Sequence, residues 1–118
     1  MPRKQQSNIQ PKKQKLFVIV RTDMAVASQM VQACHVATEW GIDRGVTYAI
    51  ENPIEWDKTM VVVTVPSLGY LDLWKRKLDL KSLEYSVFHE PDMGNTLTAI
   101  ACLTDSNIFD SLPLWLCT

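Results

Sequence analysis

The chain has 118 residues, a formal net charge of −1, and 47% hydrophobic residues. This length fits one domain that buries its own core, and this apolar content excludes a disordered chain. No apolar run is long enough to cross a bilayer, and residues 1–15 have no apolar stretch after their charges, so we expect neither a membrane-spanning nor a secreted protein. Its cysteines, Cys34, Cys102 and Cys117, form no CxxC pair, which disfavours a disulfide framework or a zinc site and favours the reducing cytoplasm.

Charge is unevenly distributed along the chain. Residues 1–15 carry five of the twelve Lys and Arg and no acid, which leaves seven bases against thirteen acids, or about −6, for the rest. We predict a flexible basic tail over residues 1–14, and a basic arm on an acidic body is one way to bind phosphates. A solvated terminus without a ligand has the same composition.

The first half of the chain predicts a strand and then a helix. The run LFVIV (16–20) is typical of a strand buried on both faces. The spacing that follows predicts a helix from Ser28, as its N-cap, to about Trp40, with Gly41 as its stop. The side chains expected on its core-facing stripe are Met30, Ala33, Cys34 and Ala37. A short second helix at 44–51 is expected before Pro53.

The second half predicts three strands and one helix. MVVVTV (60–65) is a strand, and 67–78 is a helix capped by Ser67. The helix face expected to be apolar consists of Leu68, Leu71, Trp74 and Leu78. Strands at 83–88 and 96–103 form an antiparallel pair across the loop HEPDMGN (89–95).

The element order β-α-(α)-β-α-β-β predicts an α/β fold. We expect a mixed sheet of about four strands with helices on both faces, because helical crossovers make parallel pairs and the short last loop makes an antiparallel one. The domain is expected over residues 15–104. Residues 105–118 form a tail whose apolar side chains pack on the body or on a partner subunit.

Cys34 and His35 are adjacent, but the pattern does not favour a Cys–His catalytic pair. Neighbours on a helix point about 100° apart, and a nucleophilic pair needs hydrogen-bond reach. Cys34 falls on the apolar stripe, so we predict a small buried thiol.

A polar row on the same helix is the stronger candidate site. Its members, spaced by four, three and four residues, are Ser28, Gln32, His35 and Glu39. The row begins after the first strand, at the carboxyl edge where α/β sheets place their sites. A solvated helix face, or a His35 wedged against the sheet, explains the same spacing.

Two further groups are expected at this edge. Arg21 and Asp23 end the first strand, and the last loop brings His89, Glu90 and Asp92 there if the last two strands flank the first. A carboxylate beside hydroxyls and an imidazole can activate water. Because the chain has no phosphate-cradling glycine loop and no metal-ligand spacing, we expect no cofactor and no metal.

The residues LFVIVRTDM…QACHVAT resemble the opening of the type 2 peptidyl-tRNA hydrolases, which have a buried strand, Arg-x-Asp, and a helix carrying Gln and His-Ala. TLTAIACL resembles the last strand of that family, so that the similarity covers roughly residues 16–103. The match is closer to a divergent branch of small peptidyl-tRNA hydrolase domain proteins, which carry QACHAAT and an acid–proline–acid loop similar to HEPD.

The resemblance implies a mixed four-stranded sheet between helices, and usually a homodimer. It also implies hydrolysis of the ester between a peptide and the 3′ end of tRNA, with tRNA as partner and without metal or cofactor. By position, Arg21, Asp23, Gln32 and His35 match family residues, and with His89 they are the expected substrate-binding set.

The expected catalytic set departs from the family pattern. Ser28 stands where the family has its catalytic lysine, and the family's Asp-Ala-Gly-x-Thr motif is absent. Glu90 or Asp92 is expected to supply the acid and Thr96 the hydroxyl. Loss of a cation beside a developing oxyanion commonly costs about a hundredfold in rate. The alternative function is therefore a weakened or inactive binding module for tRNA or a protein partner; an unrelated small-molecule hydrolase is a third.

Overall fold

The computed structural model describes residues 14–51 and 56–116, so the predicted basic tail lies outside the described residues except for Gln14. The elements are β1 (Gln14–Arg21), α2 (Val26–Glu51), β2 (Trp56–Val65), α3 (Leu68–Leu80), β3 (Ser86–Glu90), the 3₁₀ turn η1 (Pro91–Met93) and β4 (Thr96–Thr104). Among the described residues, no helix is long and apolar enough to cross a membrane.

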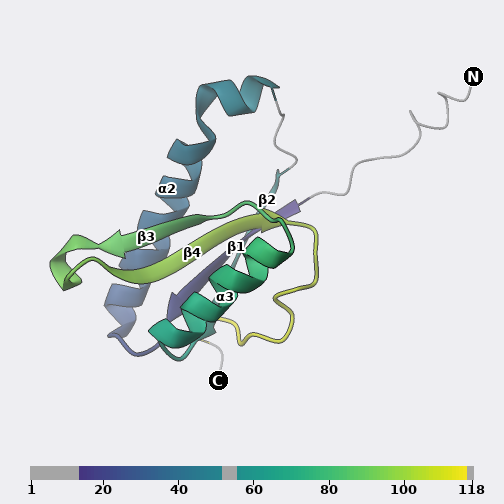
Figure 1. Ribbon diagram of the computed structural model, residues 1–118. Helices are drawn as coiled ribbons and strands as arrows, with labels where there is room; N and C mark the ends of the chain where they lie inside the picture. The colour runs from purple at the N-terminus through teal and green to yellow at the C-terminus, as the bar shows by residue number, and fades with distance from the viewer. Residues whose placement is uncertain (1–13, 52–55, 117–118) are drawn as a thin grey trace, which may run out of the picture.

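The four strands form one mixed sheet in the order β2-β1-β4-β3. β1 is parallel to β2, and β4 is antiparallel to both β1 and β3. Helix α2 covers one face and α3 the other (Figure 1). The predicted α/β fold, with a mixed sheet of four strands and helices on both faces, is confirmed.

Strand β1 is central and buried on both faces, as its continuous apolar run predicts. Leu16, Val18 and Val20 pack on the α2 side, whereas Ile19 packs on the α3 side. A strand of period two sends alternate side chains to opposite faces. One run therefore supplies both cores.

Helix α3 follows its predicted amphipathic pattern. Leu71, Trp74 and Leu78 are buried against the sheet, and Leu68 at the start of the helix is exposed. Ser67 occupies the N-cap position, although its side chain makes no capping hydrogen bond.

Helix α2 differs from the prediction at both ends. It is continuous over Val26–Glu51, so neither the stop at Gly41 nor a separate helix at 44–51 exists. A glycine inside a helix costs only about 1 kcal/mol relative to alanine, which the rest of a long helix outweighs. Ser28 is not the N-cap either, because the Gln29 amide already donates to the Ala25 carbonyl at 2.9 Å.

The buried face of α2 is also rotated away from the predicted stripe. Met30 is 51% exposed and Cys34 is exposed, so the prediction of a buried Cys34 thiol is wrong. The side chains buried from this helix are Gln29, Gln32, Val36 and Trp40. Two glutamines occupy the core-facing side because their amides find hydrogen-bond partners there, which removes the usual cost of burying a polar group.

The chain after β4 returns along the free edge of β2. The Thr64 amide donates to the Pro113 carbonyl at 2.9 Å, and the Trp115 amide donates to the Val62 carbonyl at 2.9 Å. The Trp115 indole donates to Gln29 Oε1 at 2.9 Å. This segment covers part of an exposed strand edge and joins it to the first turns of α2.

The two described cysteines are expected to differ sharply in reactivity. Burial raises the pKa of the Cys102 thiol to about 11, so at about pH 8 only about one molecule in a thousand carries the thiolate. We expect iodoacetamide to alkylate Cys34 rapidly and to leave Cys102 unmodified in the folded protein. Peptide mapping by mass spectrometry checks this; equal rates at both sites would contradict the described burial.

Candidate functional site

Gln32 lies at the centre of the candidate site, where it joins α2 to two strands. Its amide nitrogen donates to Glu90 Oε1 at 2.8 Å, and its amide oxygen accepts from the Thr98 hydroxyl at 2.7 Å. These two partners fix the orientation of the amide, because a flipped amide would direct its oxygen at the carboxylate. Gln32 is only 3% exposed, so this relay is shielded from water.

A β-bulge brings Thr98 into the relay. Phe88 pairs with Ala99 and His89 pairs with Leu97, so Thr98 has no partner of its own across the strands. Leu97 packs on the α3 side and Ala99 on the α2 side, while the hydroxyl of Thr98 bonds Gln32 of α2. The extra residue therefore aims Thr98 at α2, which is a known use of bulges beside functional sites.

The β3–β4 turn positions Glu90. β3 ends at Glu90, and the chain turns through η1 into Gly94 and Asn95, both of which have positive φ values, 69° and 60°. The Asn95 amide donates to the Glu90 carbonyl at 2.9 Å and closes the turn. The Glu90 carboxylate in turn accepts from the Asp92 amide at 3.3 Å.

His35 borders Glu90 from the next turn of α2. Its Nε2 is 4.0 Å from Glu90 Oε1, and its ring stacks on Phe88 with centroids 4.6 Å apart. The His35 side chain is 45% exposed. His35 therefore lies against the end of the sheet with one ring nitrogen directed at the carboxylate.

Gln32 and Glu90 line a shallow cleft of about 320 Å³ between the start of α2 and the β3–β4 turn, whereas His35 and Thr98 contact them from outside its lining. The side chains that line it are Ala27, Ser28, Val31, Gln32, Glu90, Asp92 and Met93. The structure thus brings together three of the four expected catalytic residues, Ser28, Glu90 and Asp92, with Gln32 beside them.

The electrostatic state of Glu90 follows from its neighbours. The hydrogen bond from Gln32, then that from the Asp92 amide, and the nearby His35 hold the pKa of Glu90 below its usual range. Glu90 is therefore a carboxylate at neutral pH. It accepts two hydrogen bonds here and keeps acceptor sites for water.

The expected substrate-binding residues Arg21 and Asp23 bond each other instead of facing the cleft. The Arg21 guanidinium donates to both carboxylate oxygens of Asp23, at 2.9 and 2.8 Å. It also donates to the Thr96 hydroxyl at 3.0 Å and to the Leu97 carbonyl at 2.9 Å. This ion pair lowers the pKa of Asp23, and Arg21 ties the end of β1 to the start of β4.

Two other expected site residues do not line the cleft. Thr96 is held by Arg21. His89 is exposed and pairs across the sheet with Leu97, which packs on the α3 side. Cross-strand partners point to the same face of a sheet, so His89 points away from Glu90.

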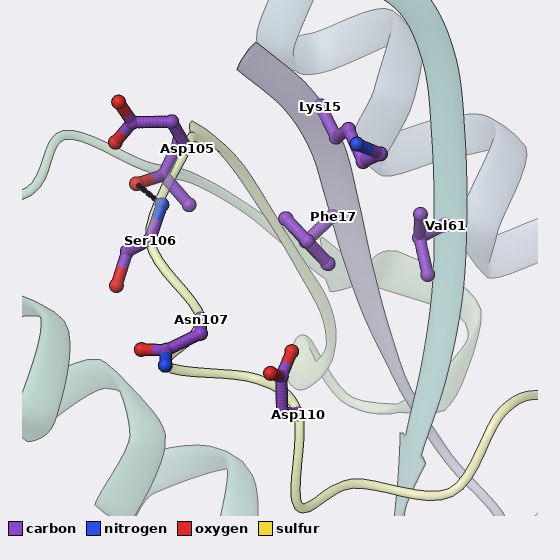
Figure 2. Close-up of a pocket in the computed structure, with 8 residues that line it drawn as sticks. Lys15, Phe17, Val61, Asp105, Ser106, Asn107 and Asp110 are labelled. Atoms are coloured by element: carbon purple, nitrogen blue, oxygen red, sulfur yellow. Dashed lines mark hydrogen bonds between the residues drawn. The ribbon is translucent and has the colours of Figure 1, made fainter. Parts of the chain in front are cut away.

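A second cavity of about 340 Å³ lies at the opposite end of β1 and β4. Figure 2 shows it between Lys15, Phe17 and Val61 on the strands and the chain after β4; Asp110 points toward Phe17, whereas the carboxylate of Asp105 points away. The hydrogen bond at its wall, from the Ser106 amide to the Thr104 hydroxyl at 3.0 Å, joins residues two apart in the sequence, whereas the bonds of Gln32 join segments 58 and 66 residues apart. We therefore take the Gln32–Glu90 cleft as the candidate functional site.

Sequence reasoning missed Thr98. The only signal was a threonine inside the apolar strand TLTAIACL, and period-two alternation would have placed it on the α3 side. The residues that the structure describes hold no cluster of His, Cys, Asp or Glu able to bind a metal ion. In comparisons with known proteins, neither a family model nor a curated protein matched this chain.

The relay predicts a specific stability effect for Thr98→Val. This change keeps the shape of a fully buried side chain but leaves the buried oxygen of Gln32 without a donor. We expect a loss of about 1–3 kcal/mol in the free energy of unfolding, measured by urea denaturation. Thr38→Val is the matched control, because that exposed hydroxyl only donates to the Cys34 carbonyl, and should change stability by about 0.5 kcal/mol or less.

The pKa of Glu90 should depend on Gln32. In Gln32→Met the donor to the carboxylate is lost, so the pKa of Glu90 should rise toward its ordinary value of 4.5. Carboxyl-detected NMR titration measures it. Gln29→Met, a second buried glutamine without a bond to Glu90, should leave it unchanged.

The same shift has a pH consequence for stability. A carboxylate whose pKa is lowered on folding stabilises the protein above its unfolded pKa and stops doing so as the pH falls through the folded pKa. Wild type should therefore exceed Gln32→Met in stability most at about pH 7, and the difference should shrink toward about pH 3. A difference independent of pH would show that Gln32 acts only through packing.

Proposed function

We propose that this protein hydrolyses the ester that links an aminoacyl or peptidyl group to the 3′ end of tRNA. The observation that carries the proposal is the convergence of Ser28, Gln32, Glu90 and Asp92 on one cleft. The proposed substrate is inferred from the resemblance of the strand, helix and loop residues to the type 2 peptidyl-tRNA hydrolases. Cytoplasmic location and assembly as a homodimer belong to the same proposal.

In the proposed reaction, Glu90 accepts a proton from a water molecule held at its free acceptor sites. The water oxygen bonds to the ester carbonyl carbon, and the Ser28 hydroxyl donates to the oxygen that becomes negative. The bond from that carbon to the ribose oxygen then breaks, and the proton returns from Glu90 to the ribose oxygen. A base with a lowered pKa is weak, so we expect Glu90 to orient the water as much as deprotonate it. The rate contribution of a general base is usually about 10²–10⁴-fold.

Gln32 and His35 have supporting roles in this proposal. Gln32 fixes the position of Glu90 through the 2.8 Å bond, and Thr98 fixes Gln32. His35, 4.0 Å from the same carboxylate oxygen, is placed to contact the tRNA end that enters over the exposed face of its ring.

The alternative is a binding module that has lost catalysis. In its favour, no Lys or Arg lines the cleft among the described residues, and Arg21 is paired with Asp23. Ser28→Lys separates the two readings: if this substitution turns on hydrolysis in an inactive wild type, the site is a decayed enzyme. If the protein binds tRNA, the affinity should fall with increasing salt concentration only where Lys or Arg side chains contact the phosphates.

The proposed reaction is tested by release of amino acid from charged tRNA, both free and N-acetylated. We expect Glu90→Gln to lower kcat/KM by about 10²-fold, because the amide accepts no proton, whereas Glu84→Gln, an exposed acid away from the cleft, should change it less than about twofold. No release above buffer by wild type would overturn the proposal. Equal activity of Glu90→Gln would assign the reaction to another group.

A further inference from the structure

Half of the cations in the described residues lie together at the C-terminal end of helix α3. Of the eight Lys and Arg in residues 14–51 and 56–116, four stand at positions 75, 76, 77 and 81. The other four, which are Lys15, Arg21, Arg44 and Lys58, each contact an acid or an aromatic ring. The cations at the end of α3 form no ion pair within the described part of the chain. Their charge is therefore available to a ligand.

These four cations do not share one side of the helix. Lys75 is half-buried and lies three or four residues from both acids of α3, so its charge is balanced on the helix surface. Lys77 and Lys81 are four residues apart, and no acid of α3 lies three or four residues from either. Arg76 is exposed between the two sides. Arg76, Lys77 and Lys81 form what we call the α3 basic patch.

The contacts around the α3 basic patch hold it in place and keep it positive. The Lys77 ammonium lies 4.4 Å from the centroid of the Trp74 ring, which is itself buried. Asp79, the one acid within residues 75–81, accepts from the Tyr85 hydroxyl at 2.8 Å instead of pairing with a lysine. The helix dipole favours cations in the last turn, which accounts for Lys77 and the adjacent Lys81 but not for Arg76, because Arg76 precedes that turn.

Helix α3 leads from the edge of the sheet that carries the cleft to the α3 basic patch. Strand β2 ends at that edge, where Val65 pairs with Arg21, and α3 begins three residues later. A helix rises about 1.5 Å per residue, so the patch lies about 12–20 Å along α3, on the opposite face of the sheet from α2 (Figure 1). Two exposed polar side chains lie on the α3 side near the cleft edge: His89 at the end of β3, and Tyr70 in the first turn of α3. Tyr70 stands seven residues before Lys77 and thus on the same side of the helix.

We infer that the α3 basic patch binds phosphates of the tRNA whose acylated end enters the cleft. The inference rests on the proposed function for the identity of the RNA. The cleft is lined by two acids and, among the described residues, by no Lys or Arg, so phosphates are repelled there. Three unpaired cations on α3 supply the charge that phosphate contacts need. The 3′ end crosses the sheet edge past His89 and Tyr70, whose hydroxyl can donate to a phosphate oxygen. Contacts of this kind position the RNA without reading its sequence.

The test measures binding of deacylated tRNA to the full chain by fluorescence anisotropy at about 50 and about 200 mM salt. The variant Arg76→Gln/Lys81→Gln changes two exposed side chains that form no ion pair, so the fold should be kept. We expect it to weaken binding at the lower salt by about 10- to 100-fold and to reduce the slope of log K against log salt by about 2. Lys15→Gln/Lys58→Gln removes the same charge from β1 and β2 and should weaken binding by less than about threefold.

Three results would overturn the inference. Unchanged tRNA affinity in Arg76→Gln/Lys81→Gln would place the phosphates elsewhere. Equal weakening by the two double variants would show that only net charge matters. Polyglutamate that competes as well as tRNA, per negative charge, would assign the α3 basic patch to an acidic protein instead.

Hydrolysis of charged tRNA separates failure of this inference from failure of the proposed reaction. We expect Arg76→Gln/Lys81→Gln to raise KM and to leave kcat unchanged, because the patch holds the RNA and not the ester. If this variant loses tRNA affinity but wild type hydrolyses no ester, the inference stands and the proposed reaction falls. If wild type hydrolyses the ester and the variant matches it in both KM and tRNA affinity, the inference falls and the proposed reaction stands.

Discussion

The hydrogen-bond relay from Thr98 through Gln32 to Glu90 is the interaction on which the candidate site depends. It joins the sheet, helix α2 and the β3–β4 turn through one amide, at 2.7 and 2.8 Å. A buried amide is costly unless both of its ends are satisfied, and then it fixes its neighbours more narrowly than an apolar contact does. The position of α2 on the sheet and the position of the acid are therefore set together.

This coupling explains why the core on the α2 side contains glutamines. Gln29 and Gln32 occupy positions that Met30 and Cys34 were expected to fill, and each is held by groups distant in sequence. The Trp115 indole holds Gln29, so the chain after β4 helps to fix the helix turn that carries Ser28. Met30 and Cys34 of α2 are consequently left on the surface, where they line a groove with Met60 of β2.

The charged residues near the cleft fall into two groups: a pair that stabilises the fold and the acids of the candidate site. Arg21 and Asp23 form a closed pair that ties β1 to β4 and compensates its own charge. Glu90 and Asp92 remain as the acids that line the cleft, with the His35 imidazole 4.0 Å from Glu90. A site with this balance attracts cationic groups and repels phosphates, so the polynucleotide part of any tRNA substrate would have to lie outside the cleft, with only its acylated end inside.

The sequence by itself determined that four strands and helix α3 exist, the order of the elements and hence the mixed sheet, because these depend on local periodicity and on short connections. The bounds of the third strand were wrong, since it lies at Ser86–Glu90 and not at 83–88. It also gave Ser28 and Gln32 as candidates, because they belong to one polar row on the helix, and the HEPD acids, because they lie in the loop before the last strand. Only the tertiary structure decided which face of α2 is buried, that His89 and Thr96 lie outside the cleft, and that Thr98 belongs to the relay. Each of those outcomes depends on partners more than 40 residues away or on a single bulge. The local hydropathy pattern predicts neither the distant contacts nor the bulge. An amide counts as polar in any sequence pattern, and only its distant partners make its burial favourable.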